Sequence, residues 1–306
     1  MEVQRSKILI TGGTGLIGQS LKNRLIAQNQ EVNILSRQAS DPQKARFTWD
    51  PGQHSMDLHA LEGIDTIINL AGSSIAGGLW TRARKKLILQ SRLDAIQTLA
   101  TGLIESKQRP RMIIQASAIG IYGHRPGEEL NELSSLGQGG FLTETVQKWE
   151  KESEMLRPLT NHLVHVRLGL VLSKLGGMWP PMTMSSKLGF LNWFGNGQQV
   201  YSWIHLEDVA QSIWFILQQN NPSKLYNLTS PNPVSQKEIM QIASKVFTSV
   251  FLSFGIPKFL VRLAPFGMSE LVLTDSKIFP SNLLSQNYKF KYSDIQECIQ
   301  ELISKK

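Results

Sequence analysis

The stretch from Lys7 to Arg37 decides the fold: it reads KILIT at residues 7–11, GGTGLIG at 12–18, then a helical stretch, then EVNILSR at 31–37. An apolar strand therefore leads through a glycine-rich turn and a helix to a second strand, which is the order of a dinucleotide-binding unit. In that unit Gly13-x-Gly15-x-x-Gly18 supplies a tight turn, a close backbone approach to a pyrophosphate, and close packing of helix on strand. We expect the pyrophosphate at the helix N-terminus, where amide N–H groups lack intrahelical partners.

The residues that end the second strand select between NAD and NADP. A carboxylate there would bind the ribose 2′-hydroxyl of NAD and repel a phosphate. This chain instead has Ser36 and Arg37, and Arg37 stands 19 positions after Gly18. The pair predicts NADP as the cofactor, although a solvated arginine at the end of a strand would give the same sequence.

The composition is that of a soluble globular protein. The chain has 306 residues, 41% of them hydrophobic, and a single cysteine, Cys298. No disulfide can form within the chain, and no Cys/His metal cluster is expected. The polar start, Met1 to Ser6, lacks the apolar core of a signal peptide, and no run of about 18 apolar residues could span a membrane. We therefore expect a cytoplasmic protein without membrane contact.

The charge balance is basic, with 32 Lys+Arg against 24 Asp+Glu and a net charge of +8. The densest basic cluster, at residues 82–86, has no helix-turn-helix, zinc finger or aromatic platform beside it. It is interpreted as a solvated helix face or as an electropositive surround for an anionic cofactor, so nucleic acid is not an expected partner. A nucleic-acid binder built on a reductase fold would have to show steep salt dependence. The sequence carries no signal for an oligomeric state.

Strands and helices alternate through the first two thirds of the chain. Strands are predicted at 47–50, 65–72, 111–117, 163–172 and 225–229, and helices at 81–105, 142–156, 235–247 and, in the tail from Pro257, 295–303. Alternation with nearly continuous apolar strands predicts an α/β fold, a Rossmann-type doubly wound parallel sheet covered on both faces. Ligands bind outside the carboxyl ends of such strands. This rule brings residues 12–18, 36–37, 70–73 and 117–122 around one crevice.

Two parts are expected along the chain. Residues 1–175 would form the NADP-binding Rossmann domain, with a strand and helix near 200–230 returning to it. Residues 176–306 would form a smaller substrate lobe, built from insertions and the C-terminal third and including a C-terminal module at about 255–303. Residues 176–199 are rich in Gly, Pro, Met and Trp, and are either a long packed loop or a substrate lid.

Four motifs resemble those of the extended and atypical short-chain dehydrogenases/reductases. They are Thr11 to Gly18, Asn69-Leu-Ala-Gly72, Ser117 to Gly123 and Trp203-Ile-His-Leu-Glu-Asp208. More narrowly, the chain resembles the epimerase-like family whose bacterial and human members are called epimerase family proteins. That family also shows the pairs Ser91-Arg92 and Trp149-Glu150 and a C-terminal module matched by 267–273, Pro280 and 288–292. The resemblance covers nearly the whole chain and implies a Rossmann fold, NADP binding and a poorly defined reaction on an unknown small-molecule substrate.

The expected cofactor-binding residues are Gly12, Gly13, Thr14, Gly15, Leu16, Ile17, Ser36, Arg37, Leu70, Ala71, Gly72 and Arg92. Arg92 is included because a planar bidentate donor on the helix after Gly72 could reach a phosphate of the cofactor or of the substrate. Arg167, in a predicted buried strand, is expected to anchor the sheet to the substrate lobe.

The usual catalytic pair of this superfamily is absent. Extended reductases use a Tyr with a Lys four positions later, and the Lys lowers the phenol pKa so that a proton can be exchanged near neutral pH. None of the five tyrosines (122, 201, 226, 288 and 292) has a Lys at that distance. Phe141 is expected at the tyrosine's place, and it has no proton to give. Ala118 stands where the active hydroxyl should be, and Ser117, one position away, would point to the other face if the strand continues.

The remaining candidates for catalysis are Ser117, Tyr122, Tyr201 and His205, and no metal site is expected. Each has a structural alternative: Tyr122 would pack beside the glycine turn, and His205 and Asp208 would cap the following helix. Two functions therefore stay open. One is an NADP(H)-binding epimerase-like oxidoreductase with a different proton donor, which the Trp/Met-rich segment favours. The other is a non-catalytic NADPH-binding sensor or regulatory protein, which the missing pair favours.

Overall fold

The structure is a computed structural model, and residues 6–247, 252–263 and 269–304 are described. The polar stretch Met1 to Arg5 and residues 264–268 of the predicted C-terminal module, which include Gly267 and Met268, lie outside the described residues.

An eight-stranded sheet forms the centre of the molecule, in the order β14-β8-β6-β5-β1-β2-β3-β4. The strands are β1 (Lys7–Thr11), β2 (Glu31–Ser36), β3 (Arg46–Asp50), β4 (Ser55–Met56), β5 (Thr66–Asn69), β6 (Met112–Ala118), β8 (His162–Leu168) and β14 (Leu225–Leu228). Neighbouring strands are parallel except β3 and β4. The predicted Rossmann-type α/β fold is confirmed. The strand order reverses direction between β1 and β5, and ligands of such sheets bind at that switch point.

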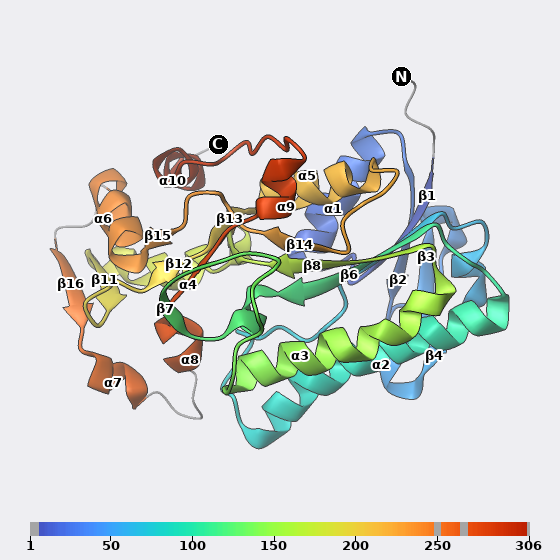
Figure 1. Cartoon of the computed structure of the whole chain (residues 1–306), viewed down its shortest axis with the longest axis horizontal. Coiled ribbons are helices and arrows are strands. Elements are labelled where there is room, and N and C mark those ends of the chain that lie inside the picture. The colour runs from blue at the N-terminus through green and yellow to red at the C-terminus, as the bar shows by residue number, and fades with distance from the viewer. Residues whose placement is uncertain (1–5, 248–251, 264–268, 305–306) are drawn as a thin grey trace.

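Helices cover both faces of the sheet (Figure 1). α1 (Leu16–Ala27) and α5 (Leu206–Leu217) lie on one face, and α2 (Arg82–Ser106) and α3 (Phe141–Ser153) on the other. Alternation along β1 explains the division, because Ile8 and Ile10 join the apolar cluster of the first face and Leu9 joins that of the second. The nearly continuous apolar runs of these strands predicted such burial on both faces.

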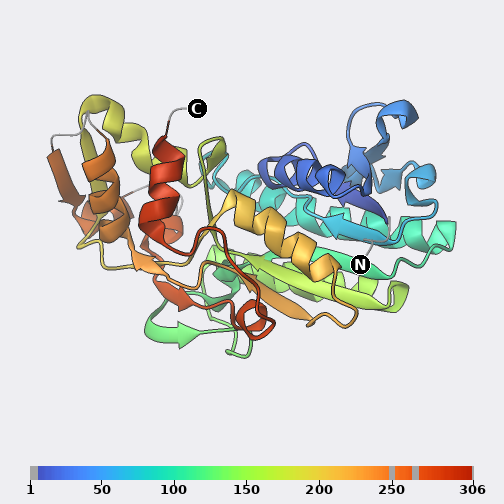
Figure 2. The ribbon, with the colours of Figure 1, turned by 90° about the horizontal axis from the view of Figure 1, so that it is seen from above.

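A smaller group of elements lies at one end of the molecule (left in Figures 1 and 2). Its helices are α4 (Trp179–Thr183), α6 (Gln236–Val246), α7 (Lys258–Arg262) and α10 (Ile295–Ile303), and its strands include β11 (Phe190–Phe194), which pairs with β16 (Leu252–Ile256). Trp179, Trp203 and Ile299 belong to its buried core. The Trp/Met-rich segment is therefore packed into this core, with Leu191 fully buried.

Short elements connect this group to the sheet. They are β7 (Arg125–Leu130), β9 (Leu170–Ser173), β10 (Gly176–Gly177), β12 (Val200–Tyr201), β13 (Trp203–His205), β15 (Val234–Ser235), α8 (Ser269–Leu273), β17 (Ser276–Ile278) and α9 (Ser281–Ser285). β17 pairs with β7, so the C-terminal region returns beside the middle of the chain. The division at residue 175 stays a prediction.

The predicted strand 163–172 is in fact two strands, β8 and β9, separated by Gly169. A Cβ on Gly169 would lie 2.6 Å from the Ser202 carbonyl oxygen and 3.0 Å from the Leu228 carbonyl oxygen. Only glycine fits there, and the chain leaves the large sheet at this point to pair with β13 instead. Of the helices that the structure describes, none is both long and apolar enough to cross a bilayer.

Candidate functional site

Three glycines shape the turn between β1 and α1. Gly12 adopts a φ of +67°, and a Cβ there would lie 2.9 Å from the Leu70 carbonyl oxygen. A Cβ on Gly18 would collide with the Gly12 carbonyl oxygen, so α1 packs directly on the turn. At Gly15 the nearest atom to an added Cβ would be the Gly12 oxygen at 3.3 Å, with nothing else within 4 Å. The left-handed residue is thus Gly12 rather than Gly13, whereas Gly15 is the glycine that faces open space.

The open space at Gly15 is a cavity of about 500 Å³, which we call the nucleotide cavity. Its lining includes the predicted residues Gly12, Thr14, Gly15, Ser36, Arg37, Leu70, Ala71 and Gly72, together with Trp49–Gly52, Ser73, Leu87, Gln90, Ser91 and Asp94. Gly13 in the turn, and Leu16 and Ile17 at the start of α1, are not part of this lining.

Arg37 is exposed at the nucleotide cavity. Among the described residues, no hydrogen bond or ion pair engages its guanidinium, whereas the Ser36 hydroxyl oxygen accepts from the Gln38 amide at 3.2 Å. A free guanidinium beside an open glycine turn is an arrangement that fits an adenosine carrying a 2′-phosphate.

A row of buried polar side chains links three neighbouring strands, at the last residues of β1 and β5 and within β6. The Thr11 hydroxyl donates to Asn69 Oδ1 at 2.6 Å, and Asn69 Nδ2 donates to Gln115 Oε1 at 2.8 Å. The Thr11 oxygen also accepts from the Leu70 and Ala71 amides at 3.1 and 3.2 Å. This row fixes the backbone that lines the nucleotide cavity, and polar residues ending otherwise apolar strands are its sequence signal.

Arg92 lies behind the nucleotide cavity. Its Nη1 donates to the carbonyl oxygens of Ser73 and Ile88 at 3.0 and 2.7 Å, and its guanidinium carbon lies 4.8 Å from the centre of the Trp149 ring. Burial, with a smaller contribution from Arg84, lowers the pKa of Arg92 to about 10. A Cβ on Gly72 would lie 3.0 Å from the guanidinium carbon. Arg92 thus supports the Gly72–Ser73 backbone from behind, and it is not part of the cavity lining.

A second cavity, of about 470 Å³, lies past the carboxyl ends of β6 and β8, and we call it the apolar cavity. Its lining comprises Ile75, Ala118–Gly120, Gly123, His124, Gln138–Gly140, Leu142, Thr143, Val146, Leu168–Leu170, Val200–Ser202, Glu270, Leu271, Thr274, Ser276 and Ile278. In the described part of the chain, its ionisable side chains are those of His124, Tyr201 and Glu270, and none is Lys or Arg.

α3 turns an apolar face to this cavity. Leu142 and Val146, four positions apart, both line it. The Phe141 ring instead packs edge-on against Trp80, with the ring centres 5.1 Å apart. Phe141 therefore does not line the cavity, whereas Leu142 and Val146 do, at the four-residue spacing of a Tyr/Lys pair, and neither carries a titratable proton.

Ser117 and Ala118 lie on opposite faces of β6, as the one-residue offset predicts. Ala118 lines the apolar cavity, whereas the Ser117 hydroxyl donates to Glu150 Oε1 at 2.5 Å. Glu150 accepts two hydrogen bonds from Arg167, each 2.8 Å long. Burial opposes the charge of Glu150, but the hydrogen bond and the charge of Arg167 outweigh it, so the pKa of Glu150 is lowered.

Tyr122 belongs to the same buried network. Its hydroxyl accepts from Arg167 Nη1 at 2.8 Å and donates to Asn227 Oδ1 at 2.9 Å, and burial raises its pKa. Arg167 therefore joins the sheet to α3 through Glu150, rather than to the substrate lobe. Both hydrogen-bonding directions of the Tyr122 hydroxyl are taken within the protein.

The other two catalytic candidates also have internal partners. Tyr201 lines the apolar cavity, but its hydroxyl donates to the Val272 carbonyl oxygen at 2.9 Å, and burial raises its pKa strongly. His205 caps α5, because its Nδ1 accepts from the Glu207 amide at 3.2 Å. It lines neither the nucleotide cavity nor the apolar cavity.

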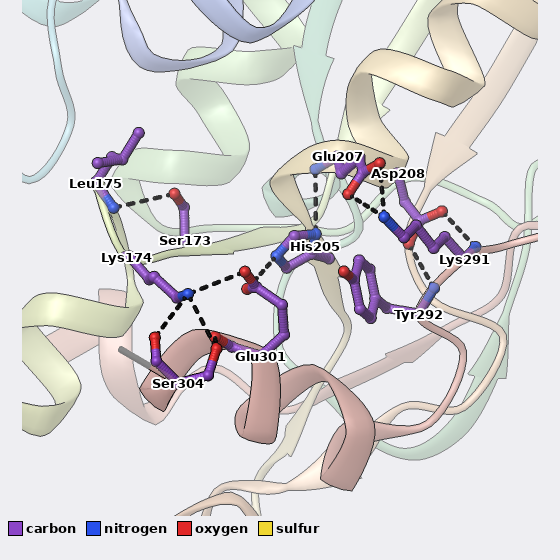
Figure 3. Close-up of polar contacts among 10 residues, drawn as sticks. All are labelled: Ser173, Lys174, Leu175, His205, Glu207, Asp208, Lys291, Tyr292, Glu301 and Ser304. Carbon is purple, nitrogen blue, oxygen red and sulfur yellow. Dashed lines mark hydrogen bonds and ion pairs between the residues drawn. The ribbon is translucent and has the colours of Figure 1, made fainter. Parts of the chain in front are cut away.

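Figure 3 shows that His205 lies between the start of α5 and the C-terminal helix, α10. Its Nε2 lies 3.2 Å from Glu301 Oε2, and the same carboxylate forms an ion pair with Lys174 at 3.0 Å. Asp208 accepts from the backbone amides of Lys291 and Tyr292 at 2.7 and 2.9 Å. These contacts fasten His205 and Lys174 to α10, and the first turn of α5 to residues 291–292, which precede α10.

Two ionisable residues of the apolar cavity, His124 and Glu270, were not predicted from the sequence. His124 Nδ1 accepts from the Asp275 amide at 3.0 Å. Glu270 accepts from the Phe141 and Leu142 amides at 3.0 and 2.9 Å. The sequence contains one signal for the contact of Glu270. Gly140 precedes α3 and has no side chain to cap it, so the acceptor for the first helix amides comes from another residue.

Fold and cavities together define a Rossmann-type nucleotide-binding protein of the short-chain dehydrogenase/reductase kind. Residues 8–140 match the NAD dependent epimerase/dehydratase family, and residues 256–302 match a domain of unknown function, DUF1731. The chain is 33% identical to epimerase family protein YfhF of Bacillus subtilis over 299 residues, which cover 97% of this chain and 98% of the relative. It is 31% identical to epimerase family protein SSP1921 of Staphylococcus saprophyticus, covering 96% and 98% of the two chains. The chain belongs to this family of epimerase family proteins.

Two solved structures extend the comparison. Human epimerase family protein SDR39U1 (isoform 2) with NADPH aligns with a TM-score of 0.87 and 27% identity, covering 97% of this chain and 98% of that chain. A nucleoside-diphosphate sugar epimerase from Corynebacterium glutamicum aligns with a TM-score of 0.77 and 29% identity, covering 98% of this chain and 58% of that one.

Proposed function

We propose that this chain is an NADP(H)-dependent, epimerase-like oxidoreductase that acts on a small molecule in the apolar cavity. The observation that carries the proposal is the free guanidinium of Arg37 beside the open turn at Gly15. The human relative solved with NADPH supports the same choice of cofactor.

The chain's own residues would bind and position the reactants. When bound, the nicotinamide supplies or accepts a hydride. Arg37 and the Ser36 hydroxyl would hold the 2′-phosphate, and Gly15 would leave room for the pyrophosphate. Thr11 and Arg92 would keep the Leu70–Ser73 backbone in place from behind. The apolar lining of the second cavity would exclude water from the reacting groups.

His124 is our proposed proton donor at the apolar cavity. Because its Nδ1 accepts from the Asp275 amide, the neutral imidazole carries its proton on Nε2. For Ser117, Tyr122 and His205 we propose structural roles, since their polar atoms have partners away from both cavities. Tyr201 stays a weaker candidate, because its hydroxyl is already bonded to Val272.

The second candidate function is an NADPH-binding sensor or regulatory protein. It is favoured by the missing Tyr/Lys pair, since Leu142 and Val146, which line the cavity at the four-residue spacing of such a pair, are both aliphatic. Stopped-flow oxidation of bound NADPH, screened against small carbonyl compounds, separates the two functions. Hydride transfer that slows at least about tenfold in His124→Gln supports the enzyme and its donor. Tight NADPH binding without transfer to any compound of the screen supports the sensor.

A further inference from the structure

The chemistry of the apolar cavity limits what it can bind. We infer that it takes an uncharged, largely apolar carbonyl compound and rejects anionic ligands such as nucleotide sugars, and that Glu270 sets this selectivity. The inference rests on the proposed function, because it names the substrate class of that same site.

The side chains of the cavity are poorly suited to a phosphate. Phosphates are recognised by Arg and Lys side chains or by free backbone amides, and none of the described lining residues is Arg or Lys. The hydroxyl groups of the lining donate to backbone oxygens instead: Thr143 to Gly120 at 3.0 Å, Ser202 to Ser276 at 2.8 Å, and Tyr201 to Val272 at 2.9 Å. A ligand therefore meets mainly aliphatic side chains and hydroxyl groups whose protons are already shared.

Two backbone amides in the first turn of α3 already have an acceptor within the protein. The first turn of α3 lies at the cavity, and its amides would be the natural partners of a ligand anion. Glu270 Oε2 accepts from the Phe141 amide and Oε1 from the Leu142 amide. A carboxylate of the chain thus occupies the position that an anionic ligand would need, and a second anion would be repelled by it.

Gly140 makes this contact possible. It is the N-cap of α3, with a φ of +85° and no capping side chain of its own. A Cβ at this position would lie 2.6 Å from Glu270 Oε1. The glycine and the carboxylate therefore fit together as one unit, although they are far apart in the sequence.

Glu270 is held in place by the short helix that carries it. It lies on α8, in the segment matched by the domain of unknown function. The Thr274 hydroxyl donates to the Glu270 carbonyl oxygen at 2.6 Å, and the Tyr201 hydroxyl donates to Val272 of the same helix. The C-terminal module therefore contributes to the site a negatively charged carboxylate, that of Glu270, at the N-terminus of α3.

The test uses the full chain saturated with NADPH and three probes: acetophenone, 4-acetylbenzoate and UDP-glucose. Binding of each probe is measured by titration calorimetry at neutral pH. For the wild type we expect acetophenone to bind at least about tenfold more tightly than 4-acetylbenzoate, and UDP-glucose to bind no better than 4-acetylbenzoate. Glu270→Gln keeps one of the two acceptor oxygens for the helix amides and removes the charge, so the preference should fall to about threefold or less. Glu105→Gln, an exposed glutamate on α2 outside both cavities, is the matched control and should keep the wild-type preference.

The outcomes separate this inference from the proposed function. A wild type that fails to bind NADPH contradicts the proposed function. A wild type that binds NADPH, but binds either anionic probe as tightly as acetophenone or fails to bind acetophenone, overturns the substrate class alone. An unchanged preference in Glu270→Gln overturns the role of Glu270. If that variant does not fold, the wild-type ratio of the two acetyl compounds and its change with added salt still decide the inference, since repulsion by a fixed charge weakens as salt rises.

Discussion

Leu142 and Val146 lie one helical turn apart on α3, and both line the apolar cavity. Related reductases have a Tyr and a Lys at this spacing, and the Lys lowers the pKa of the phenol. Leu142 and Val146 are both aliphatic. The glycine turn and Arg37 nevertheless line one open cavity, which is the proposed nucleotide site. The proposed cofactor binding and the proposed proton transfer therefore depend on different residues, and each can be tested without the other.

Arg37→Ala should remove most of the preference for NADPH over NADH. The guanidinium would make charge-assisted hydrogen bonds to the 2′-phosphate, and each such bond contributes about 1.5–3 kcal/mol. The wild type should therefore prefer NADPH by about tenfold to several hundredfold, and the variant should bind NADH as before. Fluorescence titration of both cofactors measures this, with Arg82→Ala as the control because Arg82 is exposed on α2 and outside the nucleotide cavity. Equal affinities in the wild type would contradict the assignment of NADP.

Gly15→Val should abolish cofactor binding while the protein stays folded. An added side chain at Gly15 would enter the nucleotide cavity and meet almost no protein atoms. Gly18→Ala should instead lower the free energy of unfolding, because its Cβ would collide with the Gly12 carbonyl oxygen. Overpacking of this kind costs about 1–3 kcal/mol in the free energy of unfolding. Urea unfolding and NADPH titration of both variants check the contrast, and wild-type NADPH affinity in Gly15→Val would mean that the turn is only structural.

The local part of this site could be predicted from the sequence, and the long-range part could not. The turn at residues 12–18 and the orientation of Ser117 follow from spacing and strand alternation, which are properties of neighbouring residues. The break at Gly169 depends on Ser202 and Leu228 approaching it in space. Glu270 likewise reaches α3 from 129 residues away, and Gly140 indicates only that α3 lacks a cap of its own, not which residue supplies one.

The pair Glu150–Arg167 should make stability depend on pH. The pKa of Glu150 is lowered in the folded state, so its contribution is complete above its unfolded pKa of about 4.3 and is lost as the pH falls through the lower folded pKa. Glu150→Gln should lose stability at neutral pH, by about 3–5 kcal/mol because Arg167 is left buried without its partner. The difference from wild type should shrink in acid. Urea unfolding at a series of pH values measures it, and a difference that stays constant down to acid pH would argue against the paired carboxylate.

His205→Gln should affect stability rather than chemistry. His205 caps α5 and contacts Glu301 of the C-terminal helix. Loss of a capping group costs about 0.5–2 kcal/mol in the free energy of unfolding. NADPH affinity and the rate of hydride transfer should stay at the wild-type level, since His205 lines neither cavity. A variant that is fully stable but slow in hydride transfer would return His205 to the list of catalytic candidates.

Leu142→Tyr combined with Val146→Lys should increase the rate of hydride transfer. Both side chains face the apolar cavity from the same side of α3, so the substitutions would put a phenol beside an ammonium group that lowers its pKa. General acid–base assistance contributes about 10²–10⁴-fold, and the gain should lie within that range if proton donation limits the wild type. Single-turnover NADPH oxidation with acetophenone measures the rate, and each single substitution serves as a control because neither alone supplies both the phenol and the ammonium group.

A wild-type rate that already matches that of the double variant, with a fully folded protein and bound NADPH, would show that another group donates the proton efficiently. His124→Gln in both backgrounds then identifies it: the loss should be large in the wild type and small in the double variant.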